Sequence, residues 1–306
     1  MCRTTAMAAS QLANGWTAKP VMGAVLLRLS NMTNSPYKLP DGNVQISFSG
    51  GRTSAYMLHQ ILCANDGLPD RVVVTFANTG REMPETLDFV NDCSVQWGIP
   101  IVWLEYDRPD GKAGYKVVGE NSASQNGKPF EILIKQKKYL PNVVTRFCTT
   151  ELKILPMKRY LTKELGWKKW SACVGIRADE GHRANTESKD RWSYWYPLLN
   201  AKVSKIDVNE FWANSWFDLR LDNSSGSTAK GNCDFCFLKS EATLAAMARM
   251  HPERAKWWLE MESNVGSTFR KGRDLNEFVD FVNKQQDWIF DEQGYVCQAE
   301  DGECAV

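Results

Sequence analysis

One stretch of the chain, VQISFSGGRTSAYMLHQIL at residues 44–62, limits the possible folds more than any other. Its first residues alternate between apolar and polar, as in a strand with one face more buried than the other, and apolar residues then recur at helical spacing. Two glycines, flanked by hydroxyls and a cation, lie in the turn between them. Such a turn favours an anion site, because glycines let the backbone approach closely while free N–H groups and the helix dipole attract a phosphate. The plain alternative is an ordinary turn with a serine N-cap, and these residues alone leave both open.

The same alternation of strand and helix continues along the next segments. The apolar run RVVVTFANTG at 71–80 suits a buried parallel strand. A helix is predicted over 85–97 with Gly98 as its C-cap, and a third strand over IPIVWLEY at 99–106. This repetition predicts a doubly wound, mostly parallel α/β sheet of the Rossmann-like type, with ligands at the carboxyl ends of the strands. The turns SGGRTS and NTGRE would then lie at one edge of the sheet.

The rest of the chain divides by composition. Residues 111–142 are rich in glycine and lysine and predict a loop over the site, followed by a helix over 150–166 and a strand over 170–180. Most of the remainder is amphipathic and predicts helices. We therefore expect three parts: an N-terminal extension of uncertain order at 1–43, an α/β domain with the candidate anion site and the C-x-x-C at 44–240, and a helical C-terminal region with a flexible tail at 241–306.

Composition narrows the class of protein. The 306 residues carry a net charge of +1 and 43% hydrophobic residues, so global charge gives no argument for nucleic acid or a membrane as partner. No apolar run approaches the roughly 20 residues that span a bilayer, and the apolar segment 21–29 does not resemble a signal peptide. Nine irregularly spaced cysteines without an export signal predict a cytoplasmic protein. The C-x-x-C of Cys233 and Cys236 favours metal, iron–sulfur or redox use.

Five motifs in order resemble the PP-loop adenine-nucleotide superfamily and, within it, the sulfonucleotide (phosphoadenylyl sulfate and adenylyl sulfate) reductase family. The similar stretches are SFSGGRTS, NTGREMPETLDFV, CTTELKILP, VGIRADEGHR and YPLLNAKVSKIDVNEFW, and with the C-x-x-C they cover about residues 44–240. CTTELKILP matches the family pattern Cys-Cys-x-x-Arg-Lys-x-x-Pro at Cys148, Lys153 and Pro156. Thr149 stands where the second cysteine of that pattern should be.

The resemblance implies a nucleotide site. The residues expected to bind the nucleotide are Ser49, Gly50, Gly51, Arg52, Thr53, Ser54, Thr79, Gly80, Arg177 and Arg183. Arg52 stands in place of the superfamily's lysine and could clamp a phosphate or sulfate through two parallel hydrogen bonds. Thr53 stands in place of the aspartate of ATP-cleaving members, which weakens the case for Mg²⁺ because a carboxylate helps to hold that ion. Magnesium is therefore expected only if ATP is cleaved.

The resemblance also implies a [4Fe–4S] cluster, since thiolates are soft, anionic donors to iron. The expected ligands are Cys148, Cys233 and Cys236. The candidates for a fourth ligand are Cys173, Cys297 and Cys304. The fourth iron could instead stay open, and zinc or no metal at all are the alternatives. Lys153 is expected to balance the charge of cluster and substrate.

The leading function implied by the resemblance is reductive cleavage of adenylyl sulfate, or of its 3′-phosphate, to sulfite by a thiol reductant such as thioredoxin. Cys304, in a tail that ends DGECAV, is similar to the Glu-Cys of the reductases' C-terminal motif and is the expected nucleophile. The alternative is an exposed cysteine without a catalytic role near a frayed end. Two other functions stay open: ATP-dependent sulfur transfer to a nucleic-acid base, and a nucleotide-binding regulatory module without catalysis.

Overall fold

A six-stranded sheet forms the centre of the protein, with the strand order β4-β3-β2-β1-β5-β6. The computed structural model describes residues 35–185, 187, 190–224 and 226–284. The strands are β1 (Val44–Phe48), β2 (Val72–Asn78), β3 (Ile101–Asp107), β4 (Gly114–Val118), β5 (Trp170–Cys173) and β6 (Trp192–Trp195). All pairings are parallel except that of β4 with β3. The predicted doubly wound, mostly parallel α/β sheet is therefore confirmed.

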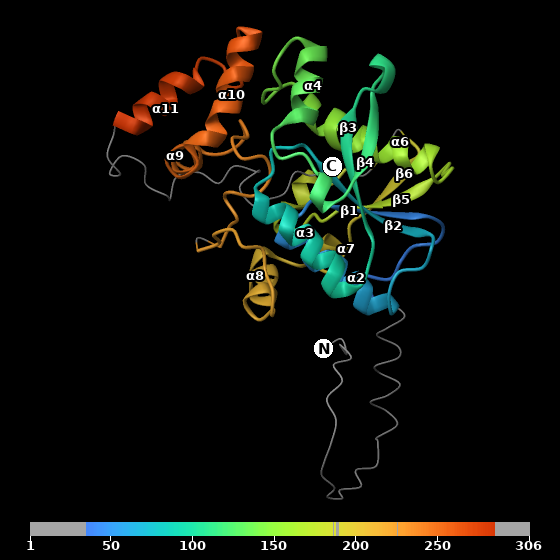
Figure 1. Ribbon diagram of the computed structural model, residues 1–306. Helices are drawn as coiled ribbons and strands as arrows, with labels where there is room; N and C mark the ends of the chain where they lie inside the picture. Colours follow the sequence, from blue (N-terminus) through green and yellow to red (C-terminus); the bar gives the residue numbers. More distant parts are fainter. Residues whose placement is uncertain (1–34, 186, 188–189, 225, 285–306) are drawn as a thin grey trace, which may run out of the picture.

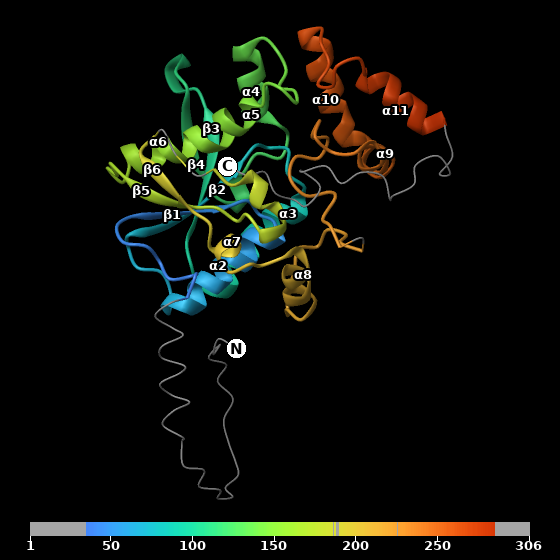
Figure 2. The same ribbon diagram turned by 180° about the vertical axis from the view of Figure 1, so that it is seen from behind.

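Helices cover both faces of this sheet (Figures 1 and 2). The α-helices are α2 (Arg52–Asn65), α3 (Pro84–Trp97), α4 (Lys128–Lys137), α5 (Phe147–Thr149), α6 (Leu155–Lys163), α7 (Pro197–Asn200), α8 (Lys205–Ala213), α9 (Glu241–Met250), α10 (Pro252–Val265) and α11 (Leu275–Lys284). Short turns of other types are η1 (Pro109–Gly111), η2 (Glu120–Ser122), the π-helical η3 (Thr150–Ile154) and η4 (Ala178–Arg183). As Figure 1 shows, α9, α10 and α11 form a helical group beside the sheet, as predicted for this part of the chain.

The central strand β1 is buried on both faces although only alternate residues are apolar. Its apolar residues belong to the main core of the protein. Its polar residues lie on the other face, where the Gln45 amide donates 2.8 Å hydrogen bonds to Ser47 Oγ and Thr75 Oγ1. The alternation seen in the sequence thus reflects one apolar and one polar buried face, and the polar groups satisfy each other's hydrogen-bonding needs.

Residues 111–142 contain more structure than the predicted loop. The antiparallel edge strand β4 and the ten-residue helix α4 both lie in this segment. One side of α4 buries Phe130, Leu133 and Ile134, whereas Lys128 and Lys135 stay exposed. The loop prediction was wrong because glycine and lysine content hid the helical period of these few apolar residues.

A wide turn interrupts the helical segment before β5. Residues 147–163 run through α5, η3 and α6, and the Leu155 N–H bonds to the Thr150 carbonyl five residues back. Pro156 follows immediately and has no N–H, so the regular α-helical bonding is already broken at this point. Leu152 and Lys153, both within the wide turn, are buried.

The parallel strands bring three loops to one edge of the sheet. β1 lies between β2 and β5, so the strand order reverses at β1. The segments that follow β1, β2 and β5 all leave from the carboxyl ends of parallel strands. Open α/β sheets bind ligands at such a switch point. The SGGRTS and NTGRE turns therefore lie where the sequence predicted them.

Residues 35–43 pack onto the end of α2. The Asn65 side chain donates to the Tyr37 carbonyl at 2.9 Å and accepts from the Leu39 N–H at 3.2 Å. This part of the predicted N-terminal extension is thus attached to the sheet domain. In the described part of the chain, no helix has the length and apolar character needed to cross a membrane.

Removal of apolar volume from β1 should destabilise the whole sheet. Ile46 is fully buried, and Ile46→Ala should lower the free energy of unfolding by about 2–5 kcal/mol because it leaves a cavity in a packed core. Urea unfolding followed by circular dichroism measures this change. Val144, which is 91% exposed, offers the control Val144→Ala, for which we expect a change within about 0.5 kcal/mol. Equal stabilities of the two variants would contradict the central position of β1.

Candidate functional site

The SGGRTS loop connects β1 to α2 and forms the amino end of this helix. Gly51 is the N-cap residue, and no side chain caps the helix there. Ser54 Oγ donates to the Gly51 carbonyl at 3.0 Å and lies 2.9 Å from Ser49 Oγ, so these hydroxyls hold the turn together. The first-turn N–H groups of this 14-residue helix point toward the edge of the sheet. This arrangement can bind an anion through backbone N–H groups and the helix dipole.

Two constraints require glycine at position 50. Its backbone has a φ of +81°, a conformation that residues with a side chain rarely adopt. A Cβ atom there would also lie 2.7 Å from Thr86 Cγ2 and 3.1 Å from Val90 Cγ2 in α3. The first glycine of the motif therefore lets the loop pass close to α3.

The Arg52 guanidinium contacts a distant part of the chain. Its Nε and Nη2 bond to the two carboxylate oxygens of Asp218 at 2.8 Å each, and its Nη1 donates to Thr228 Oγ1 at 2.6 Å. The carbonyls of Leu219 and Leu221 also accept from Nη2. These contacts favour a structural role for Arg52, which attaches a distant segment to the loop, over the expected phosphate clamp.

Arg177 and Arg183 follow β5 at the same edge of the sheet. Arg177 is 1% exposed, and its Nη1 donates to Thr53 Oγ1 at 3.0 Å while its Nη2 pairs with Asp179 at 3.1 Å. Arg183 pairs with the buried carboxylate of Glu180. Arg177 therefore links the segment after β5 to the SGGRTS loop and brings a positive charge beside it.

The NTGRE loop after β2 reaches from the SGGRTS side of the sheet to the C-x-x-C. The Glu82 carboxylate accepts hydrogen bonds of 2.9 Å from both the backbone N–H and the hydroxyl of Thr79. Gly80 has a φ of +79°, and its carbonyl accepts from the Gly127 N–H at 2.9 Å. Thr79 Oγ1 lies 3.3 Å from Cys233 Sγ. One threonine of the predicted nucleotide site thus touches a predicted metal ligand.

The three predicted metal ligands line one small pocket. Cys148 comes from α5, and Cys233 and Cys236 come from the segment before α9, 85 and more positions later in the chain. Thr79, Arg146, Thr149 and Lys153 line the same pocket. The free volume between these side chains is about 30 Å³. The structure therefore brings together Lys153, Thr79 and the three cysteines that the sequence singled out.

Burial dominates the electrostatics of this pocket. It raises the pKa of the Cys233 thiol well above its usual range, and the carboxylate of Glu82 adds to this rise. The Lys153 ammonium acts in the opposite direction and favours the thiolate. A bound cation or cluster would favour the thiolate in the same way.

The pocket offers three thiol side chains, the donor type that iron–sulfur clusters use, and one fewer than the usual four. Thr149 lines the pocket at the place of the family's second cysteine, and its hydroxyl is a hard, neutral donor unlike a thiolate. Cys173 is buried in β5 with its thiol 3.5 Å from Met57 Sδ, and it does not line this pocket. Cys297 and Cys304 lie outside the described residues. Across 35–284, wherever the structure describes side chains, no three histidine, cysteine or acidic residues surround a position for a single metal ion.

Two carboxylates that hold these loops could not be recognised from the sequence. Asp218 binds Arg52, and Asp234, inside the C-x-x-C, binds Arg81 and Arg254. Asp218 lies in a segment without a motif, and Asp234 occupies a position that the C-x-x-C pattern leaves unspecified. Only the tertiary contacts identify the two residues.

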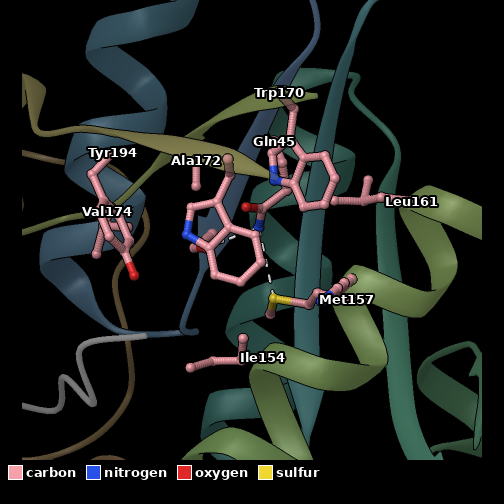
Figure 3. A pocket seen from close by; sticks show the side chains of 11 residues that line it. Gln45, Ile154, Met157, Leu161, Trp170, Ala172, Val174 and Tyr194 are labelled. Atoms are coloured by element: carbon pink, nitrogen blue, oxygen red, sulfur yellow. Dashed lines mark hydrogen bonds between the residues drawn. The ribbon is translucent and has the colours of Figure 1, made fainter. Parts of the chain in front are cut away.

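A second cavity lies on the α6 side of the sheet (Figure 3). Met157 and Leu161 of α6 face Trp170 and Ala172 of β5 across it, with Gln45 of β1 beneath. Its free volume of about 20 Å³ has room for about one water molecule. None of the predicted nucleotide-binding residues or cysteines lines it, so it is separate from the candidate site.

Comparison with known proteins assigns the chain to a family. Residues 43–206, more than half of the chain, match the phosphoadenosine phosphosulfate reductase domain. This match includes the loops that follow β1, β2 and β5, together with Cys148. The protein therefore belongs to the phosphoadenosine phosphosulfate reductase domain family, as its motifs predicted. Cys233 and Cys236 lie beyond the matched residues.

Two curated relatives are similar over parts of their length. An uncharacterized nin region protein of Escherichia phage lambda is 32% identical over 201 residues, which are 64% of this chain and 66% of the relative. An uncharacterized protein of Methanocaldococcus jannaschii is 23% identical over 234 residues, 73% of this chain and 48% of the relative. The chain thus spans about two thirds of the first relative and half of the second.

Two solved structures resemble the chain loosely. One is a phosphoadenylyl-sulfate reductase from Candida auris in a phosphate complex, with 17% identity and a TM-score of 0.36 over 65% of this chain and 88% of that one. The other is a U34-tRNA thiolase from Methanococcus maripaludis with its [4Fe–4S] cluster, with 10% identity and a TM-score of 0.39 over 92% of this chain and 86% of that one.

A side chain at position 50 should distort the SGGRTS loop. Gly50→Ala should lower the free energy of unfolding by more than Gly42→Ala, because both positions have a positive φ but only position 50 also lacks space for a Cβ. The strained φ costs about 1–2 kcal/mol in each variant, and the contact with Thr86 adds to this at position 50. Urea unfolding of both variants measures the difference. Equal losses of stability would contradict the close approach of the loop to α3.

Proposed function

We propose that this protein binds an adenine nucleotide at the SGGRTS and NTGRE loops and cleaves a sulfur–oxygen bond of that nucleotide. The substrate would be adenylyl sulfate or its 3′-phosphate, and the product sulfite. Membership of the phosphoadenosine phosphosulfate reductase domain family supports nucleotide chemistry of this kind.

One observation carries the proposal: three cysteines from two distant segments line a pocket that the NTGRE loop also lines. Thr79 contacts Cys233 at 3.3 Å, so sulfur donors lie next to residues that the resemblance assigns to the nucleotide. Lys153, a cation that is 8% exposed, lines the same pocket and favours the thiolate of Cys233. The arrangement suits a reaction in which anionic sulfur groups gather beside a bound nucleotide.

The residues at the edge of the sheet would each bind or neutralise one part of the substrate. Backbone N–H groups at the start of α2 would bind the phosphate, and Arg177 would balance the charge near Thr53. Arg183, which pairs with Glu180 after the same strand, would neutralise a further anionic group of the substrate. Lys153 would face the sulfate from the cysteine pocket. A [4Fe–4S] cluster bound by the three pocket cysteines would supply redox-active iron beside the nucleotide.

The chemical step needs a nucleophilic thiolate and a reductant. The Cys304 thiolate would attack the sulfate sulfur, so that an S–S bond forms, the S–O bond to the phosphate breaks, and AMP or its 3′-phosphate leaves. A dithiol such as thioredoxin would then supply two electrons. One of its thiols attacks the Cys304 sulfur and releases sulfite, and its second thiol resolves the mixed disulfide and regenerates Cys304.

A second candidate function is ATP-dependent transfer of sulfur to a nucleic-acid base. Thr149 in the pocket supports it, because three thiol donors would leave one iron of a cluster without a protein ligand. Thr53 in place of an aspartate argues in the other direction, since Mg²⁺ and ATP would lack one carboxylate.

Loss of any pocket cysteine should remove the cluster. Protein reconstituted anaerobically with iron and sulfide should bind about four of each per chain. Cys148→Ser, Cys233→Ser and Cys236→Ser should each lose most of the iron and the visible absorbance, because serine is a poor iron donor. Cys63→Ser, in α2 and away from the pocket, is the matched control and should keep both. Full iron content in all three pocket variants would refute the cluster.

Separate assays of sulfite release and of AMP formation from ATP decide between the functions. Wild-type protein should release sulfite from a sulfonucleotide when a dithiol is present, and Cys304→Ser should abolish this release while nucleotide binding persists. AMP from ATP without sulfite would instead support sulfur transfer. Nucleotide binding with neither product would show a regulatory module and overturn both enzymatic proposals.

A further inference from the structure

We propose that Asp234 is a positioning residue that joins the NTGRE loop to the C-x-x-C, so that nucleotide binding and the cysteine pocket influence each other. The inference rests on the proposed nucleotide site and goes beyond it, because it names the contact through which the two halves of the site communicate. It concerns a residue that touches neither the expected nucleotide loop SGGRTS nor the metal position itself.

The Asp234 carboxylate is fully buried and surrounded by donors. Arg81 donates through Nε at 3.3 Å and through Nη2, and Arg254 of α10 donates through Nε at 2.5 Å. Trp258 Nε1 donates at 2.7 Å, and the Phe235 N–H at 2.9 Å. One carboxylate thus accepts hydrogen bonds from two guanidinium groups, an indole and a backbone N–H of its own loop.

These contacts belong to a closed circle of hydrogen bonds that joins three segments: the NTGRE loop, the C-x-x-C and α10. The Asp234 N–H donates to the Arg81 carbonyl at 2.9 Å, so backbone and side chain both connect the C-x-x-C to the NTGRE loop. Arg81 Nη2 donates to the Arg254 carbonyl at 2.9 Å, and Arg254 Nη2 donates to the Glu82 carbonyl at 2.8 Å. Helix α10 therefore holds the two loops from outside. A shift of either loop would therefore break hydrogen bonds to the other loop and to α10.

Charge makes this circle hard to open. Arg81 is 4% exposed, and Arg254 is largely buried, with 13% of its side chain exposed. If the loops separated, at least one guanidinium would lose its counter-charge in a buried place, which is far more costly than the loss of a surface ion pair. The Arg81 guanidinium also lies 4.9 Å from the centre of the Trp257 ring, which fixes its position further.

The circle connects groups that act on the two parts of the site. Thr79 and Glu82, on either side of Gly80 and Arg81, hold the NTGRE loop in shape through their hydrogen bonds, and Thr79 touches Cys233. A nucleotide that restrains Thr79 and Gly80 would therefore also restrain the C-x-x-C. Thermodynamic linkage is reciprocal: if a bound nucleotide raises the affinity of the cysteine pocket for its ligand by some factor, that ligand raises the affinity for the nucleotide by the same factor.

Hydrogen exchange on the full-length, metal-free protein tests this inference. In Asp234→Asn the amide groups of 79–83 and 233–239 should both exchange about tenfold faster or more, while those of β2 should be unchanged. AMP is used as the nucleotide probe. It should slow exchange in both 79–83 and 233–239 of the wild type. In the variant it should slow exchange in 79–83 alone. Faster exchange in 233–239 alone, or uniformly faster exchange that includes β2, would overturn the proposal.

Two further variants keep the test decisive if Asp234→Asn fails to fold. Trp258→Phe removes one neutral donor and should raise exchange in the same two segments by a smaller factor. Arg220→Gln is the control, because it breaks exposed ion pairs with Asp88 and Asp92 of α3 and should change neither segment. No change in either segment of Trp258→Phe would count against the proposal. If wild-type protein ignores AMP, the nucleotide site fails, whereas joint exchange of the two loops still decides the role of Asp234.

Discussion

The position of β1 between two parallel neighbours is the constraint on which the site depends. Strands that run parallel end at the same edge, so the loops that follow β1, β2 and β5 meet although they lie far apart in the sequence. The cysteine pocket is built next to that edge, by the segment before η3 and by the C-x-x-C that Asp234 attaches to the NTGRE loop. The direction of the parallel strands therefore brings the glycine loops and the cysteine pocket to the same edge of the sheet.

Most of the features that the sequence predicted correctly are local ones. The helical period of 85–97 and its glycine C-cap appear in α3, where Gly98 has a φ of +63°. The glycine turns lie at the strand ends because each motif specifies its own backbone conformation. Cys148, Cys233 and Cys236 line one pocket, and the match over residues 43–206 confirms the predicted family.

The features that the sequence did not predict depend on contacts between distant segments. An arginine in a glycine loop suggests a phosphate ligand, but Arg52 binds Asp218, and no local pattern could reveal that partner. Asp234 was missed in the same way. Its position between two cysteines predicts an exposed carboxylate, but contacts with the distant Arg81 and Arg254 enclose it. Helix α4 was missed for a different reason. Only three of its aliphatic and aromatic residues are buried, and so few residues give a weak helical period in a lysine-rich segment.

The wide turn between α5 and α6 has a consequence for how this family can vary. Each residue of a helix turns the chain by about 100°, so deletion of one residue within 150–154 would restore regular winding and rotate everything before it by that angle. Cys148 would then no longer point into the pocket that Cys233 and Cys236 also line, although no cysteine had been altered. A relative that lacks this single residue should have lost the pocket even if all its thiols remain.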